Sequence, residues 1–120
     1  MNKTQIHIKQ LRLSAHIGIH AWEKQWPQLV YADAILTLQK APLNDDIANA
    51  CDYTVIAAYM QVVCKKTHYN LLETLTTTLA QDLLTEFSFS TVQLTLFKQG
   101  ALPNSQGIGI STTLEKTTLP

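Results

Sequence analysis

The sequence has 120 residues, 46% of them hydrophobic and 15% charged, and nine basic side chains balance nine acidic ones. This length suits one domain, so we expect residues 1–120 to fold as a single unit. Zero net charge without a basic stripe argues against nucleic acid or an anionic membrane as a partner. No apolar run approaches the roughly 20 residues of a membrane span, and no signal-peptide core is evident, which predicts a cytoplasmic protein.

Alternating polarity opens the chain. Apolar side chains recur at every second position over 4–14, with a phase shift near Gln10 that predicts a strand containing a bulge. A second alternating stretch over 28–40 predicts another strand. The segment between them contains Gly18, which permits backbone angles that other residues avoid, so we expect a loop of special shape. Residues 41–46 combine Pro, Asn and Asp and are expected to end the second strand.

The period then changes to that of a helix. From about residue 54 apolar side chains follow three- and four-residue steps, and Asp52 is placed to cap this first helix. Leucines at similar steps predict a second helix, with Asn70 as the expected cap. Alternation resumes over 92–96 and again over 108–114, which predicts two more strands. Strands and helices in separate blocks indicate an α+β domain, with two helices on one face of an antiparallel four-stranded sheet, in the order β-β-α-α-β-β.

Four short stretches stand out by their order and spacing. They are Ile17-Gly18-Ile19-His20-Ala21-Trp22-Glu23, Asp45-Asp46-Ile47 with Cys51-Asp52-Tyr53, Leu71-Leu72-Glu73-Thr74-Leu75, and Lys98-Gln99-Gly100-Ala101. At this spacing the chain resembles the dihydroneopterin aldolase family along nearly its whole length. One position differs from the family pattern, because Gln99 stands where most of these aldolases have proline. The sister group of dihydroneopterin triphosphate epimerases also lacks proline at this position.

The resemblance implies a particular architecture. In this family the subunit has the tunnelling fold, and four subunits join their sheets into a ring that commonly stacks into an octamer. We therefore expect a homo-oligomer, tetramer or octamer, with active sites between subunits. Joining sheets would also hide the strand edges that a lone four-stranded sheet exposes. The resemblance implies no cofactor and no metal, and a structural or catalytic zinc or iron site would need at least three converging ligands.

The resemblance also assigns roles to particular residues. Lys98 would carry proton transfer without forming a Schiff base, and Glu23 would contact the substrate and orient Lys98 or a water. Tyr53 would reach the substrate from the neighbouring subunit. The Glu73 carboxylate would accept two parallel donors of the pterin ring, and backbone groups near Leu72 would complete that recognition. Without the resemblance each residue has a simpler explanation, such as a helix-dipole carboxylate for Glu73 or a solvated lysine for Lys98.

The predicted function is a folate-pathway lyase. It would cleave 7,8-dihydroneopterin by a retro-aldol reaction to 6-hydroxymethyl-7,8-dihydropterin and glycolaldehyde, with the ring imine accepting the released electrons. An alternative is an epimerase acting on the same side chain, which Gln99 keeps open. A further alternative is a pterin-binding oligomer without catalysis, which would need Glu73 but not Lys98, Glu23 and Tyr53 together. The sequence leaves open whether phosphorylated substrates are accepted and whether His20 lines the pocket.

Overall fold

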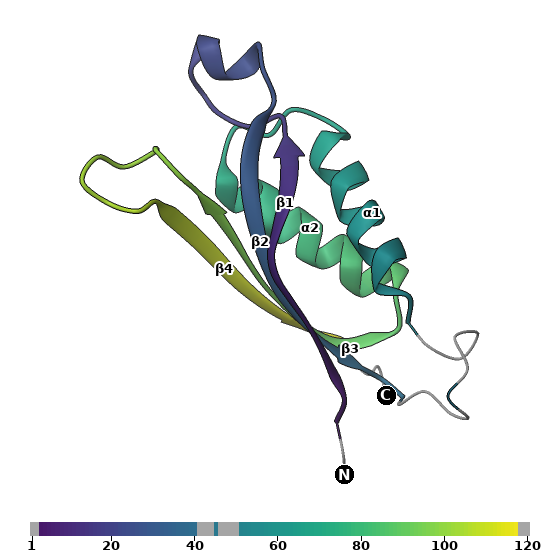
Figure 1. Ribbon diagram of the computed structural model, residues 1–120. Helices are drawn as coiled ribbons and strands as arrows, with labels where there is room; N and C mark the ends of the chain where they lie inside the picture. Colours follow the sequence, from purple (N-terminus) through teal and green to yellow (C-terminus); the bar gives the residue numbers. More distant parts are fainter. Residues whose placement is uncertain (1–2, 41–44, 46–50, 118–120) are drawn as a thin grey trace.

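The computed structural model describes residues 3–40, 45 and 51–117. Four strands form one antiparallel sheet in the order β1-β2-β3-β4, and two α-helices cover one of its faces (Figure 1). The predicted architecture and the order β-β-α-α-β-β are confirmed. The elements are β1 (Gln5–Ala15), the 3-10 helix η1 (Ala21–Lys24), β2 (Gln28–Leu38), α1 (Tyr53–Lys65), α2 (Leu72–Glu86), β3 (Phe89–Lys98) and β4 (Ile108–Glu115).

The phase shift in β1 is a bulge, as predicted. The pairing of β1 with β2 slips between Ile8 and Leu11, and Gln10 adopts a φ of 52°. The Gln10 amide, which the bulge removes from the ladder, donates to the Asp33 carboxylate at 2.7 Å. The bulge lets both halves of β1 direct apolar side chains toward the helices, although the apolar positions change parity along the strand.

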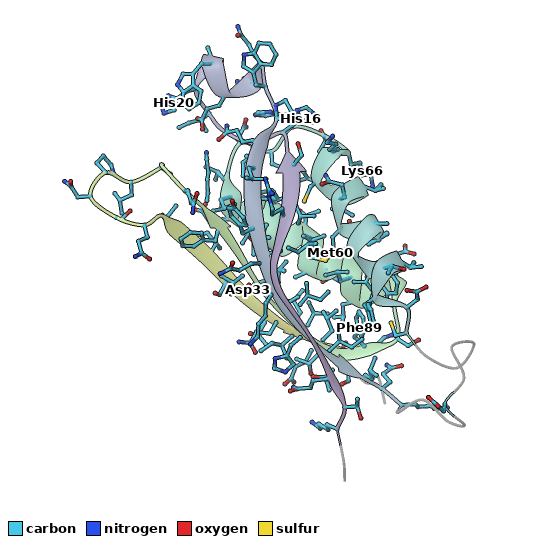
Figure 2. All side chains as sticks on the ribbon, in the orientation of Figure 1. His16, His20, Asp33, Met60, Lys66 and Phe89 are labelled. Atoms are coloured by element: carbon cyan, nitrogen blue, oxygen red, sulfur yellow. The ribbon has the colours of Figure 1, made fainter. Side chains whose placement is uncertain are left out.

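The core lies between the helices and the sheet. Along β2 the side chains at alternate positions from 30 to 36 are buried, and the strand's last residue, Leu38, is half-buried after a register shift. Figure 2 labels two fully buried members of the core, Met60 in α1 and Phe89 at the start of β3. The remaining large, fully buried side chains come from both helices, three strands and the loop after β1: Leu13, Ile17, Val30, Leu36, Ile56, Leu75, Leu79, Leu83, Leu94 and Leu96.

The two helices begin in different ways. Asp52 caps α1, as predicted, and its side chain accepts from the Thr54 amide at 2.9 Å. The prediction that Asn70 caps α2 was wrong. Leu71 has the extended cap conformation, and the first bond of the helix runs from the Leu75 amide to the Leu71 carbonyl, so Asn70 lies one residue too early. No helix among the described residues is both long enough and apolar enough to cross a membrane.

The segment between β2 and α1 was expected to break the strand and to carry part of the family resemblance. Of its residues, 41–44 and 46–50 lie outside the described part of the chain. Asp45 is described and has a φ of 48°.

Several segments converge at one end of the sheet. The end of β1 meets the start of β2, where Ala15 pairs with Gln28, and β3 runs antiparallel beside β2 and ends at Lys98. A parallel bridge joins Ile17 to Tyr69, just before α2. In contrast, α1 begins at the opposite end of the sheet, beside Ile6 and Ile8 of β1 (Figure 1). The convergent end is where the predicted lysine and the first loop meet.

Candidate active site

A pocket of about 350 Å³ occupies the convergent end of the sheet. This size falls in the range of small-molecule sites. Its walls come from the loop after β1, the start of β2, the segment leading into α2, and the turn after β3. The lining residues are Ile17, Gly18, Ile19, His20, Trp22, Glu23, Gln28, Asn70, Leu71, Leu72, Lys98, Gln99, Gly100 and Ala101.

Glu23 and Lys98 form an ion pair in this wall. The Lys98 Nζ atom lies 2.8 Å from the Glu23 Oε2 atom, and the two side chains are 15% and 7% exposed. Lys98 is the last residue of β3, and Glu23 belongs to η1, so the fold brings together residues 75 positions apart. Few charged side chains are this buried without a partner, and here each is the other's partner.

Two further donors hold the Glu23 carboxylate. The backbone amide of His20 donates to Oε1 at 3.2 Å, and the Gln28 side-chain amide donates to Oε2 at 3.2 Å. The same Gln28 amide nitrogen also donates to the Ile17 carbonyl at 2.6 Å. The hydrogen bond from Lys98 lowers the pKa of Glu23 to about 2, aided by Gln28 and His20 and opposed by burial. Glu23 is therefore ionised at neutral pH.

Gly18 makes room for that carboxylate. It is buried and has a φ of 130°, a conformation that side-chain-bearing residues rarely adopt. A β-carbon at this position would collide with the side chain of Glu23. The special loop predicted around Gly18 thus has a definite purpose, because it lets the backbone pack directly against the ion pair.

The predicted site residues fall into two groups. Glu23, Lys98 and Leu72 line the pocket together. Glu73 follows Leu72 in the first turn of α2, where it is exposed and is not among the lining residues. Tyr53 lies elsewhere: it is 66% exposed at the start of α1 and borders a separate apolar pocket beside Ile6 and Ile8. Within one chain, the structure does not bring Tyr53 to the ion pair.

The question of His20 is answered by the geometry. His20 lines the pocket, and its ring lies parallel to that of Trp22 within 3°, with centroids 6.2 Å apart. Figure 2 shows His20 at the outer end of the loop that carries η1. Within the described ranges, no three His, Cys, Asp or Glu side chains gather into a group that could hold a metal ion.

Sequence reasoning missed Gln28, which touches both the ion pair and the loop backbone. A glutamine at the start of a strand has no sequence signal of its own, since its role depends on the loop folding back over it. It also missed Asn70, which lines the pocket although it was expected to cap α2.

Comparisons with known proteins point to one family. The family model described as "FolB: Dihydroneopterin aldolase" matches residues 6–113. The chain is 27% identical over 107 residues to the dihydroneopterin aldolase of Escherichia coli K12, covering 88% of each chain. A crystal structure of the E. coli enzyme with neopterin superposes with a TM-score of 0.84 at 26% identity, covering 92% of this chain and 98% of that one. A Burkholderia aldolase bound to guanine gives a TM-score of 0.80 at 19% identity, covering 96% and 93%.

The chain therefore belongs to the dihydroneopterin aldolase family. Its subunit has the tunnelling fold expected from the resemblance. Family membership supports the lyase interpretation and not the epimerase or binding-only alternatives.

The ion pair makes a pH-dependent contribution to stability. The folded-state pKa of Glu23, about 2, lies below its ordinary value of 4.5, so the unfolded chain binds the proton more tightly. That contribution is complete above about pH 5 and is lost as the pH falls toward 2. Lys98→Met should lower the free energy of unfolding by about 1–3 kcal/mol at pH 7, because a buried carboxylate loses its main partner.

The measurement is urea unfolding at fixed chain concentration, from pH 7 down to pH 3. The difference between Lys98→Met and the unsubstituted chain should shrink as the pH falls. Lys24→Met, which removes an exposed lysine at the end of η1, is the matched control and should show little change. An equal difference at pH 7 and pH 3 would mean that the ion pair is not its source.

Proposed function

We propose that this pocket cleaves the side chain of 7,8-dihydroneopterin to give 6-hydroxymethyl-7,8-dihydropterin and glycolaldehyde, without a cofactor. The observation that carries the proposal is the Lys98–Glu23 ion pair, 2.8 Å long, in the wall of a ligand-sized pocket. It places a proton donor and an ionised carboxylate beside the space where a substrate would lie.

The chemistry requires only that protons move. The bond between the first and second side-chain carbons breaks, and the hydroxyl on the second carbon loses its proton as that carbon becomes an aldehyde. The electron pair flows toward the ring imine, whose nitrogen gains a proton. The first carbon is then protonated and the ring nitrogen loses its proton, which restores the imine. The net result is transfer of one proton from a hydroxyl to a carbon, a task for positioned acids and bases.

Lys98 is the residue we assign to this proton transfer. Its ammonium is held by the Glu23 carboxylate, and a lysine held in this charged form is set up to donate a proton rather than to attack a carbonyl. Glu23 remains ionised, and its role is to orient Lys98 and to contact the substrate side chain. No Schiff base is needed, because the pterin ring already contains the imine that accepts the electrons.

Glu73 and the backbone at Leu72 are assigned to ring recognition. Leu72 lines the pocket, and Glu73 is the next residue, in the first turn of α2. Amide groups in the first turn of a helix have no partner within the helix and can serve a ligand. The E. coli relative binds neopterin and the Burkholderia relative binds guanine. Both ligands have an amino group next to a ring N–H, the pair of donors that a carboxylate accepts in a fork.

Tyr53 is assigned to the site of a neighbouring subunit in a homo-oligomer, tetramer or octamer. Tyr53 begins α1 at the end of the sheet away from Lys98, and its exposed side chain borders the pocket beside Ile6 and Ile8, so it meets an ion pair only in a second chain. The edge strands β1 and β4 each pair on one side within the described part of the chain, which leaves both edges able to join other sheets.

The test of the function is a product assay with purified protein and 7,8-dihydroneopterin, separated by chromatography. We expect 6-hydroxymethyl-7,8-dihydropterin and glycolaldehyde in equal amounts, at a rate unchanged by a metal chelator. Appearance of 7,8-dihydromonapterin alone would instead establish the epimerase, and the assay would then be repeated with the triphosphate. Binding of neopterin without any product would indicate a pterin-binding protein without catalysis.

Mutations should separate proton transfer by Lys98 from ring recognition by Glu73. Lys98→Ala should lower kcat by at least about a hundredfold while neopterin affinity changes little, because proton transfer is lost and ring recognition is kept. Glu73→Ala should weaken neopterin binding by at least about tenfold, since the ring donors lose a charged acceptor. Calorimetric titration with neopterin and steady-state kinetics measure both. Full turnover by Lys98→Ala, or unchanged affinity in Glu73→Ala, would remove that residue from its role.

Mixed oligomers test whether Tyr53 serves a neighbour. Lys98→Ala chains and Tyr53→Phe chains should each be nearly inactive alone. After joint unfolding and refolding at equal amounts, about a quarter of the shared sites should contain both native residues, with activity to match. If Tyr53 and Lys98 of the same chain formed one site, no mixture could regain activity.

A further inference from the structure

The segment between the two helices clamps the loop that carries Glu23. The Gly18 amide donates to the Tyr69 carbonyl at 2.9 Å, and the Tyr69 amide donates to the His16 carbonyl at 2.8 Å. These two bonds form the parallel bridge between Ile17 and Tyr69. They attach the loop to the chain just before α2 through backbone groups alone, whatever side chains are present.

One side chain completes the clamp. The His68 Nε2 atom lies 2.7 Å from the Gly18 carbonyl oxygen. Since a carbonyl only accepts, Nε2 carries the proton and donates. Both backbone polar groups of Gly18 are therefore bonded to residues 50 and 51 positions away in the chain. His68 itself is half-buried and does not line the pocket.

The clamp joins two walls of the pocket. On one side Gly18 packs against the side chain of Glu23, so a shift of Gly18 would shift the ion pair. On the other side Tyr69 is followed directly by Asn70, Leu71 and Leu72, which line the opposite wall. We propose that His68 is a positioning residue that holds the wall carrying Glu23 and Lys98 at the correct distance from the wall at the start of α2.

The role is distinct from general support of the fold. Without the imidazole, the two backbone bonds at Tyr69 remain. Tyr69 is only 6% exposed, and its hydroxyl still donates to the Val63 carbonyl at 3.2 Å. Loss of His68 therefore frees one face of Gly18 and leaves the core in place. Displacement of a reacting group by even a fraction of an ångström lowers the rate of the chemical step more than it lowers binding.

The kinetic experiment uses the full chain and rests on the proposed function. His68→Leu removes the donor and keeps an apolar body of similar size, whereas His68→Gln keeps an amide donor at similar reach. Thr67→Val, at an exposed neighbouring position, is the matched control. We expect His68→Leu to lower kcat about tenfold with KM within about twofold, and His68→Gln to restore most of kcat.

A second measurement does not depend on turnover. Hydrogen exchange of the amides in residues 17–23 should be about tenfold faster in His68→Leu, and near the original rate in His68→Gln and Thr67→Val. If the unsubstituted protein cleaves nothing, the proposed function has failed, and exchange alone decides the role of His68. Unchanged exchange, unchanged kcat in an active enzyme, a change in KM alone, or a loss that glutamine does not restore would each overturn the proposal.

Discussion

The ion pair between Lys98 and Glu23 is the contact on which the rest of the site depends. It requires β3 to end beside the start of β2, so that Lys98 arrives at the loop after β1. It also requires Gly18, because any β-carbon there would occupy the space of the Glu23 side chain. Gln28 then binds both the carboxylate and the loop backbone, so a pair of buried charges is held from several sides. Such bonding lets a carboxylate remain ionised out of water.

The two ends of the sheet have different roles. The convergent end holds the ion pair, the loop with Gly18 and the start of α2, whereas the other end presents Tyr53 on the surface. The role proposed for Tyr53 requires chains to associate, because Tyr53 lies away from Lys98 of its own chain. The two edge strands offer the means to build the proposed oligomer.

Much of the fold could be predicted because its signals are local. Alternation and three- to four-residue steps located all four strands and both helices, and the parity change at Gln10 revealed the bulge. The cap at Asp52 was correct because the side chain bonds two residues ahead. The cap at Asn70 was wrong because the path of the chain into α2 follows its bridge to the loop after β1, a tertiary contact. Neither Gln28 nor His68 carries a local signal. Gln28 bonds to the Ile17 carbonyl and His68 to the Gly18 carbonyl, and only the folded loop brings those carbonyls within reach.

By itself, then, the sequence determined the order of elements, the face of each strand that is buried, a loop of special shape at Gly18 and membership of the family. These features follow from periodicity, from backbone preferences and from the order of the motifs, and all three can be read directly from the amino-acid sequence. Only the tertiary structure decided that Glu23 meets Lys98, that the carboxylate stays charged, and that Tyr53 lies away from both. Those facts depend on how closely segments up to 75 residues apart approach one another. They also depend on how far packing shields the side chains from water.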